Sequence, residues 1–274
     1  MNHHDHAPTT SLVNRFAPAI TNPHALNGLD ERLLLERNGD LAIYYAPFEY
    51  LNPAARVALV GITPGPTQMN NAIARARQAL LAGTSPAEAA RLAKEAAGFS
   101  GEPLRTNLVN QLNHWGVQEW LGLSSAAELF GAARQLVQTT SLLRFPVFKD
   151  GKKYEGTPNM TRHPMLRRFL LEHFAREVEQ LPQAVFIALG PKVAEVIQTL
   201  VADGVLAADR VITGMLHPSG ENGYRIKYLL GDRSGELPHR TSPQPYDDGR
   251  AAFRRRYLGR AVAQPKPAAS AAER

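Results

Sequence analysis

Apolar runs alternate with helix-like segments along most of the chain. Residues 41–45 (LAIYY) predict a strand, and residues 56–62 (RVALVGI) are a continuous apolar run typical of a strand buried on both faces. The remaining predicted strands lie at 136–143, 184–190 and 210–216, and the predicted helices at 70–82, 86–97, 104–114, 125–134, 164–180, 191–202 and 248–261. Such alternation predicts βαβ units, and therefore an α/β fold with three layers (α/β/α) around a mostly parallel central sheet of about four strands.

Composition divides the chain into one domain and two extensions. Residues 40–232 carry the alternating pattern, whereas residues 1–39 show little sustained periodicity. Residues 233–274 form the second extension, with a basic helix and a predicted disordered tail at 264–274 (QPKPAASAAER). The histidines of HHDH at 3–6 fit a frayed terminus better than a metal site.

Composition also excludes several kinds of protein. The 274 residues include no cysteine, which excludes disulfides, a thiolate nucleophile, cysteine-based zinc sites and iron–sulfur clusters, and permits the cytoplasmic location that we expect. No apolar run approaches the ~18 residues that span a bilayer, and the N-terminus lacks the apolar stretch of a secretory signal.

The charge balance favours polyanionic partners. The 31 Lys and Arg residues outnumber the 25 Asp and Glu residues, which gives a formal net charge of +6. The segment 250–260 (RAAFRRRYLGR) holds five arginines and no acid. This segment is either a solvated helix face or a phosphate-contacting surface.

Two loops follow predicted strands and carry the candidate chemistry. Residues 61–69 (GITPGPTQM) lack both the G-K-[ST] ending of a Walker loop and a G-x-G-x-x-G fingerprint, and residues 217–222 (HPSGEN) begin with a histidine. Taken singly, the first loop fits a tight strand-to-helix connection and the histidine fits a packed side chain. Because ligands of open α/β sheets bind beyond the carboxyl ends of the strands, we expect one cleft to receive both loops.

Both loops, with the strand–Gly–helix segment AVFIALGPKVAEVI at 184–197, resemble the uracil-DNA glycosylase superfamily. The frame Gly-x-x-Pro-Gly-Pro-x-x-Met is most similar to its single-strand-selective monofunctional branch. The resemblance implies a base-excision repair enzyme that flips a damaged base, foremost uracil, out of DNA and hydrolyses its N-glycosidic bond to leave an abasic site. It implies no metal or organic cofactor, and no lysine lies in either loop to form a Schiff base. The expected partner is uracil-containing DNA, single- or double-stranded. We expect the protein to act as a monomer and not to associate with a membrane.

The resemblance also assigns catalytic roles. His217 would donate a hydrogen bond from a neutral imidazole to the departing base, or else be a buried structural histidine. Thr63 stands where the family has Asp or Asn to orient water, and its hydroxyl cannot act as a general base near neutral pH. Glu102 is the alternative carboxylate.

The base is expected to contact the loop after the strand at 56–62, the end of the strand at 136–143 and an aromatic ring. Phe99 would stack on the base, or else lie in the core. Ser141, beside Thr140, stands where the family presents an asparagine, and serine lacks the paired amide. Gly65 leaves space open beside the base, which would admit 5-substituted uracils. The other expected base-binding residues of the first loop are Gly61, Ile62, Pro64 and Gln68.

The second loop is expected to contact the DNA backbone. Ser219, Asn222, Tyr224 and Arg225 are the expected DNA-binding residues, with Lys227 beside them, although Tyr224 to Leu230 also fits the start of a packed helix. Three alternative functions stay open: a glycosylase for another deaminated or oxidised base, a non-catalytic member that binds damaged DNA, and a nucleotide-binding regulator.

Overall fold

The computed structural model describes residues 10–22, 29–231 and 242–259. A four-stranded sheet, sheet B, lies at its centre, with strand order β4-β3-β7-β8 and every neighbouring pair parallel. Its strands are β3 (Val57–Gly61), β4 (Val137–Ser141), β7 (Val185–Ala188) and β8 (Val211–Ile212). The predicted α/β fold with a parallel sheet of about four strands is therefore confirmed.

Helices cover both faces of sheet B, which gives the predicted three layers. Every residue of β3 is buried, and its side chains alternate between two hydrophobic cores. Val57 and Leu59 belong to one core with residues of α4 (Leu104–Trp115), α5 (Val117–Leu121), α9 (Gly223–Leu229) and α10 (Gln244–Leu258). Ala58 and Val60 belong to the other with residues of α2 (Pro66–Leu81), α7 (Arg176–Gln180) and α8 (Pro191–Ala202).

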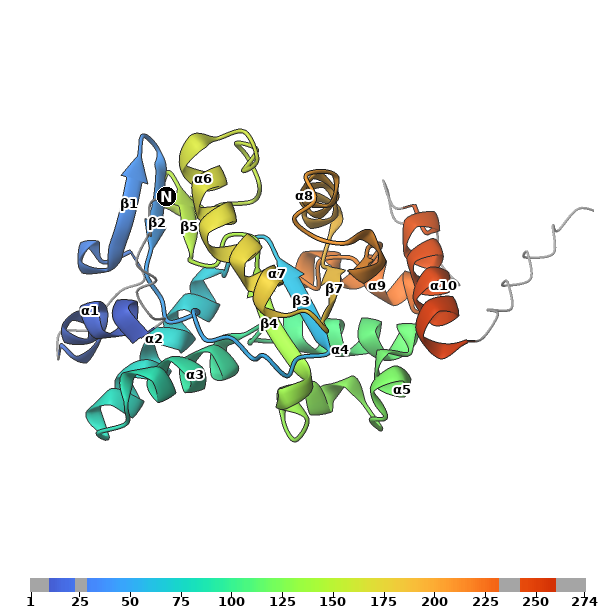
Figure 1. Cartoon of the computed structure of the whole chain (residues 1–274), viewed down its shortest axis with the longest axis horizontal. Helices are drawn as coiled ribbons and strands as arrows, with labels where there is room; N and C mark the ends of the chain where they lie inside the picture. Colours follow the sequence, from blue (N-terminus) through green and yellow to red (C-terminus); the bar gives the residue numbers. More distant parts are fainter. Residues whose placement is uncertain (1–9, 23–28, 232–241, 260–274) are drawn as a thin grey trace, which may run out of the picture.

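A second sheet, sheet A, is antiparallel and was not expected. Its strands are β1 (Leu34–Asn38), β2 (Leu41–Tyr44), β5 (Val147–Lys149) and β6 (Lys152–Lys153), in the order β1-β2-β5-β6. The predicted strand at 41–45 is β2 and belongs to this sheet. In Figure 1, β1, β2 and β5 lie at one end of the molecule and α10 at the other. The short β5–β6 hairpin follows β4 closely along the chain.

The described parts of both extensions pack against the domain. Helix α1 (Thr10–Thr21) contacts α2 and α3 (Pro86–Ala97), and β1 pairs with β2. Helix α10 contacts α4, α5 and β8, and three of its arginines donate to main-chain carbonyls: Arg250 to His114, Arg254 to Trp115 and Arg256 to Asp209. These arginines therefore attach α10 to the domain. The segments 3–6 and 264–274 lie outside the described residues.

Several predicted elements differ in extent from the observed ones. The predicted helix at 125–134 is replaced by two 3-10 turns, η2 (Ala126–Phe130) and η3 (Arg134–Leu136), because Gly131 leaves the helical region with φ −142° and ψ −110°. The predicted strand at 210–216 is paired only over β8. A side chain at Gly214 would put its Cβ 2.2 Å from the Pro245 carbonyl oxygen, so α10 packs directly on this stretch of backbone.

The remaining elements are short helices and turns that connect the strands. The helical segment predicted at 164–180 consists of α6 (Pro164–Phe169), a π-helical turn η4 (Leu170–Ala175) and α7. Short 3-10 turns also occur as η1 (Glu31–Leu33), η5 (Ala208–Arg210) and η6 (Gly220–Asn222). None of the helices in the described ranges combines the length and the apolar character needed to cross a membrane.

Candidate functional site

A cleft of about 260 Å³ lies beyond the carboxyl ends of β3 and β4. Both loops singled out from the sequence line it, together with the turn that precedes α4 and one residue of sheet A. The lining includes Gly61, Thr63, Gly65 and Gln68 of the first loop, Phe99, Ser100, Gly101 and Glu102 of the turn, Ser141, Lys153, and His217, Ser219 and Gly220 of the second loop. The two loops therefore form one concave surface, at the sheet edge where α/β proteins bind ligands.

His217 is held as a neutral imidazole. Its Nδ1 accepts a hydrogen bond from the Ser219 amide at 3.3 Å, so the ring proton resides on Nε2. Burial, reinforced by the charge of Lys153, lowers the pKa of His217 to about 4. At neutral pH the ring can therefore donate one hydrogen bond from Nε2 to a group in the cleft.

The backbone around His217 is fixed by amide side chains of α4. Gln111 is fully buried and makes two hydrogen bonds to the main chain of Leu216, donating to its carbonyl at 3.2 Å and accepting from its amide at 3.1 Å. Asn107 donates to the carbonyl of Pro218 at 3.1 Å. On the other side, Gly190 lies so close that a Cβ there would be 3.3 Å from the Cβ of His217. The position of the imidazole is thus determined by packing on two sides.

The lowered pKa of His217 makes the stability of the fold depend on pH. Between about pH 4 and 6.5 the unfolded chain binds a proton at this position that the folded protein does not, so the free energy of unfolding falls as the pH decreases through that window. Each unit of pKa difference corresponds to about 1.4 kcal/mol. His173, whose pKa burial also lowers to about 4, contributes in the same direction. We therefore expect urea unfolding of His217→Ala to show a shallower decline from pH 6.5 to 4 than the wild type; equal declines would contradict the buried neutral imidazole.

Thr63 does not have the free hydroxyl that the sequence suggested. Its Oγ1 donates to the carbonyl of Phe145 at 2.9 Å and accepts from the amide of Val147 at 3.1 Å. The hydroxyl proton is therefore used to attach the first loop to the start of β5. Thr63 can therefore bind a water only as an acceptor, through its remaining lone pair.

Glu102 and Ile62 also differ from expectation. Glu102 lines the cleft at its exposed rim, and its Oε2 accepts from the amide of Thr106 at 3.2 Å, in the first turn of α4. Ile62 does not line the cleft, because its side chain packs against the core that contains Ala58 and Val60, while its carbonyl accepts from the Leu143 amide. Ile62 is thus a core residue rather than a base contact.

Phe99 lines the cleft, and its ring also belongs to the core that contains Val57 and Leu59, so both positions that the sequence left open are occupied. Its ring is 6% exposed and its backbone adopts a φ of +50°, which is uncommon for a non-glycine residue. Arg105 stabilises this turn by donating from Nε to the Phe99 carbonyl and from its terminal nitrogen to the Gly98 carbonyl, at 2.9 and 2.8 Å. Its guanidinium lies 3.8 Å from the ring centroid of Phe130, and burial lowers the pKa of Arg105 to about 10. The unusual backbone therefore presents Phe99 to the cleft on a rigid support.

Ser141 ends β4 directly beside the last residue of β3. The two strands pair Gly61 with Ser141, and a Cβ at Gly61 would lie 3.4 Å from the serine hydroxyl and 3.5 Å from the Phe99 ring. Ser141, Gly61 and Phe99 therefore meet at one point, where the sequence placed them as base contacts.

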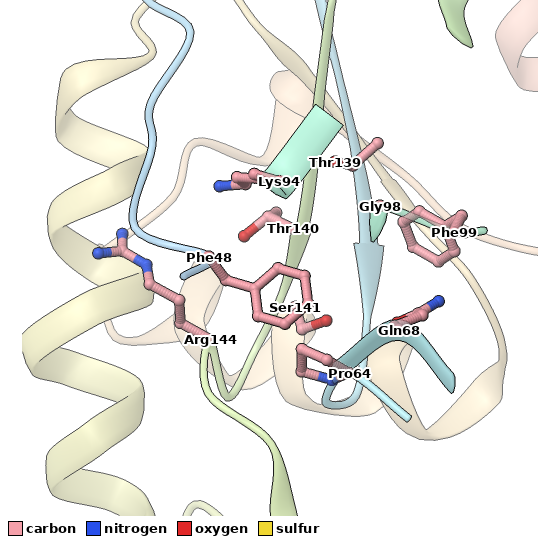
Figure 2. Close-up of a pocket in the computed structure, with 10 residues that line it drawn as sticks. All are labelled: Phe48, Pro64, Gln68, Lys94, Gly98, Phe99, Thr139, Thr140, Ser141 and Arg144. Atoms are coloured by element: carbon pink, nitrogen blue, oxygen red, sulfur yellow. The ribbon is translucent and has the colours of Figure 1, made fainter. Parts of the chain in front are cut away.

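A small inner pocket of about 20 Å³, enough for one water-sized group, adjoins the cleft. Figure 2 shows the rings of Phe48 and Phe99 well apart among the residues that line this pocket, with Ser141 beside the ring of Phe48 in this view. Pro64 belongs to its lining, and Gln68, Phe99 and Ser141 line both the pocket and the cleft. The predicted base contacts thus extend from the cleft into a deeper recess.

A buried ionic cluster adjoins the inner pocket, and its members Lys94, Thr140 and Arg144 line that pocket. We call it the Glu177 cluster; it consists of Lys94, Gln138, Thr140, Arg144 and Glu177. Arg144 and Thr140 donate to Oε2 of Glu177 at 2.9 and 3.0 Å, Gln138 donates to Oε1, and Nζ of Lys94 is 3.9 Å from Oε1. Burial alone would raise the pKa of Glu177, but Lys94, Arg144 and Gln138 outweigh that effect and lower it. The carboxylate is therefore charged and joins β4 to α3 and α7.

Some residues of the second loop that were expected to contact DNA are hydrogen-bonded within the loop, and others are exposed. Asn222 donates to the carbonyl of His217 at 2.9 Å and to the hydroxyl of Ser219 at 3.4 Å, and its own oxygen accepts from Arg225. In the protein without DNA, Asn222 therefore fixes the shape of the loop. Tyr224 is 62% exposed at the start of α9, and Lys227 is exposed one turn later.

Sequence reasoning missed four residues of the site. Asn107, Gln111 and Arg105 lie on α4 and hold the His217 loop and the Phe99 turn, whereas Lys153 arrives from β6 of sheet A. Amides on a helix facing a loop leave no pattern in the sequence, because Asn and Gln are equally common on solvated helix faces. Nothing in the sequence distinguishes Lys152 and Lys153 from other pairs of surface lysines.

Gly65 has the side chain of Lys153 as its neighbour in the cleft. The Cε and Cδ atoms of Lys153 lie 3.8 and 3.9 Å from the place that a Cβ of Gly65 would occupy. The lysine stem is therefore a neighbour of Gly65 at ordinary van der Waals distance, on the side where substituents on a base were expected.

Within the described residues, no group of three or more His, Asp or Glu side chains is arranged to hold a metal ion. No family model matches the chain, and no solved structure matches it. The chain is 38% identical over 202 residues to a protein of Bacillus subtilis (strain 168) described as "Uncharacterized protein YoxB", and the matched region covers 73% of this chain and 78% of that protein.

Proposed function

The chain belongs to the same family as the Bacillus subtilis protein YoxB, and from its cleft we propose that it is a DNA glycosylase that hydrolyses the N-glycosidic bond of a flipped-out uracil. The observation that carries the proposal is the meeting of a neutral histidine donor, an aromatic wall and the first loop in a single cleft. Flipping places the target base in such an enclosed pocket, where side chains read it by stacking and hydrogen bonding.

The residues of the cleft suit the cleavage of this bond. As the bond between C1′ and the base nitrogen breaks, its electron pair moves to the base and negative charge gathers on the carbonyl oxygens. A fixed Nε2–H of His217 aimed at such an oxygen stabilises that charge without a proton transfer. Phe99 supplies a stacking surface, which contributes about 1–3 kcal/mol per base in single-strand binding.

Water completes the reaction by attacking C1′ and releasing a proton. The Thr63 hydroxyl donates to the Phe145 carbonyl, and a neutral hydroxyl cannot take up the proton that this water releases. Glu102 lines the cleft and is exposed at its rim, and we assign to it the acceptance of the proton from water. The hydrogen bond to Thr106 leaves the second oxygen of the Glu102 carboxylate for this role.

The exposed face of the second loop suits contact with DNA beside the flipped nucleotide. Tyr224 is an exposed aromatic residue two residues after η6, close in the chain to the cleft residues Ser219 and Gly220. Lys227 adds a positive charge on the same short helix. We propose that these side chains contact the strand that carries the extruded base.

The test uses a single-stranded oligonucleotide with one central uracil and a 5′ label. The purified protein is incubated with it in EDTA, and the product is treated with alkali to cleave any abasic site. We expect alkali-dependent scission at the uracil position, and no scission of a matched oligonucleotide with thymine there. No scission on uracil or on a panel of other deaminated and oxidised bases would contradict the proposal.

A second function has a specific observation in its favour. The engaged Thr63 hydroxyl and the short side chain of Ser141 leave the cleft with few groups to activate water, which also suits a protein that binds damaged DNA without cutting it. In the same experiment this function predicts reduced gel mobility of the uracil oligonucleotide with no scission after alkali.

A further inference from the structure

We propose that Lys153 is a second catalytic residue of the cleft, which contacts the departing base and stabilises its negative charge together with His217. This inference rests on the proposed glycosylase function and names a residue that neither loop contains. It gives sheet A a function, because β6 delivers this side chain to a site otherwise built at the edge of sheet B.

The position of Lys153 supports the proposal. The residue pairs with Phe148 across the β5–β6 hairpin, and its stem packs against Gly65 of the first loop. The same side chain lines the cleft with His217, Phe99 and Ser141. A base within this cleft would therefore be enclosed by the imidazole, the aromatic ring and the ammonium group.

The charge of Lys153 is not neutralised by a neighbouring acid. Across residues 10–22, 29–231 and 242–259, its side chain has no ion pair. By contrast, Lys149 on the preceding strand pairs with Asp40 at 3.5 Å. The field of Lys153 also reaches His217, since it adds to the effect of burial in lowering the pKa of that imidazole. The carboxylate among the cleft-lining residues, Glu102, is exposed at the rim.

The two groups would act on the same charge by different means. His217 offers a neutral dipole, whose effect depends on alignment and falls off quickly with distance. An ammonium is a full charge, which stabilises an anion over a longer range in a site where water is displaced. When the N-glycosidic bond breaks, the base leaves with the electron pair of that bond, so a nearby cation lowers the energy of this state more than that of the intact nucleotide.

Two other roles for Lys153 predict different kinetics. A phosphate contact would strengthen DNA binding and change the affinity with its salt dependence, leaving bond cleavage in the bound complex unchanged. If Lys153 only supported the backbone at Gly65, its loss would slow the release of every base by the same factor. Stabilisation of the leaving group instead predicts an effect whose size depends on how readily the base bears negative charge.

The experiment compares uracil with 5-fluorouracil in one oligonucleotide under single-turnover conditions with saturating enzyme. Fluorine makes the departing base a more stable anion, so it needs less help from the protein. We expect Lys153→Met to slow uracil release about tenfold, less than the loss of an oriented hydrogen-bond donor because the ammonium is partly solvated, and to slow 5-fluorouracil release by a clearly smaller factor. Lys153→Arg, which retains the charge, should restore most of the uracil rate.

Lys152→Met is the matched control. Lys152 precedes Lys153 on β6, so its side chain points to the opposite face of the strand, and it is exposed without lining the cleft. Its rates should equal those of the wild type on both bases. Equal slowing of uracil and 5-fluorouracil by Lys153→Met, or no slowing at all, would overturn the role of Lys153 while leaving the glycosylase function intact. A wild-type protein that releases neither base would overturn both.

Discussion

His217→Ala is expected to lower the single-turnover rate of uracil release by about 10²–10³-fold, the usual effect of removing one donor from an oxyanion site. The imidazole is neutral, its Nδ1 is occupied by the Ser219 amide, and Nε2–H is the donor that remains. Because the pKa of His217 is about 4, the donor is in the same state throughout the neutral range. The rate of the wild type should therefore show no titration of this group between pH 5.5 and 8, and the measurement is the rate of abasic-site formation across that range.

His163→Ala provides the control for this substitution. His163 occupies the N-cap position of α6 without a side-chain capping hydrogen bond and does not line the cleft, so its replacement should leave the rate unchanged. His217→Ala with a rate within threefold of the wild type would contradict the assignment of the donor. A rate that rises with pH through 6.5 would equally contradict a neutral imidazole in the folded protein.

Glu177→Ala is expected to reduce the free energy of unfolding by about 3–5 kcal/mol, because it leaves two buried cations without their counter-charge. Glu177 is 1% exposed, and its two oxygens accept hydrogen bonds from Arg144, Thr140 and Gln138. Lys94 is buried as well, and burial already lowers its pKa to about 8 although Glu177 partly offsets that effect. Urea unfolding at pH 7 measures the loss.

Glu179→Ala is the control for the buried cluster. Glu179 lies on the same helix, α7, but is exposed, so its removal should change the free energy of unfolding by less than about 0.5 kcal/mol. A loss below about 1 kcal/mol for Glu177→Ala would show that the Glu177 cluster does not stabilise the junction of β4, α3 and α7 as we describe.

The sequence predicted the elements of sheet B well, for a physical reason. The run at 56–62 is apolar at almost every position because β3 is buried on both faces, and such a run has few alternatives to a central parallel strand. Helix α8 was predicted with the observed bounds, Pro191–Ala202, since Gly190 and Pro191 mark its start.

Sheet A was not foreseen because its strands other than β2 carry little pattern. Strand β1 (LLERN) is half polar, and β5 and β6 have three and two residues, too short for an alternation to appear. Their pairing depends on contacts between segments far apart in the sequence, such as β2 with β5. For the same reason the prediction missed Lys153, whose place in the cleft follows from the β5–β6 hairpin and not from its neighbours in the chain.

The site was predicted in part. His217, Phe99 and Ser141 were expected near the first loop and line the cleft beside it, because loops that leave parallel strands emerge at one edge of the sheet. The sequence did not predict that the hydrogen-bonding groups of Thr63 and Asn222 bind the main chain of neighbouring segments. Spacing in a sequence shows which residues can reach a cleft, but the hydrogen bonds that occupy them form only in the folded chain.

The central claim is that an extruded base occupies the cleft between Phe99 and His217. The most direct measurement is a crystal structure of the protein with a single-stranded oligonucleotide containing 2′-fluoro-2′-deoxyuridine, in which fluorine slows bond cleavage enough to retain the base. We predict that the uracil ring stacks on Phe99, with a carbonyl oxygen within hydrogen-bonding distance of Nε2 of His217. A complex in which the uracil lies outside the cleft, or in which the oligonucleotide occupies another face of the protein, would contradict it.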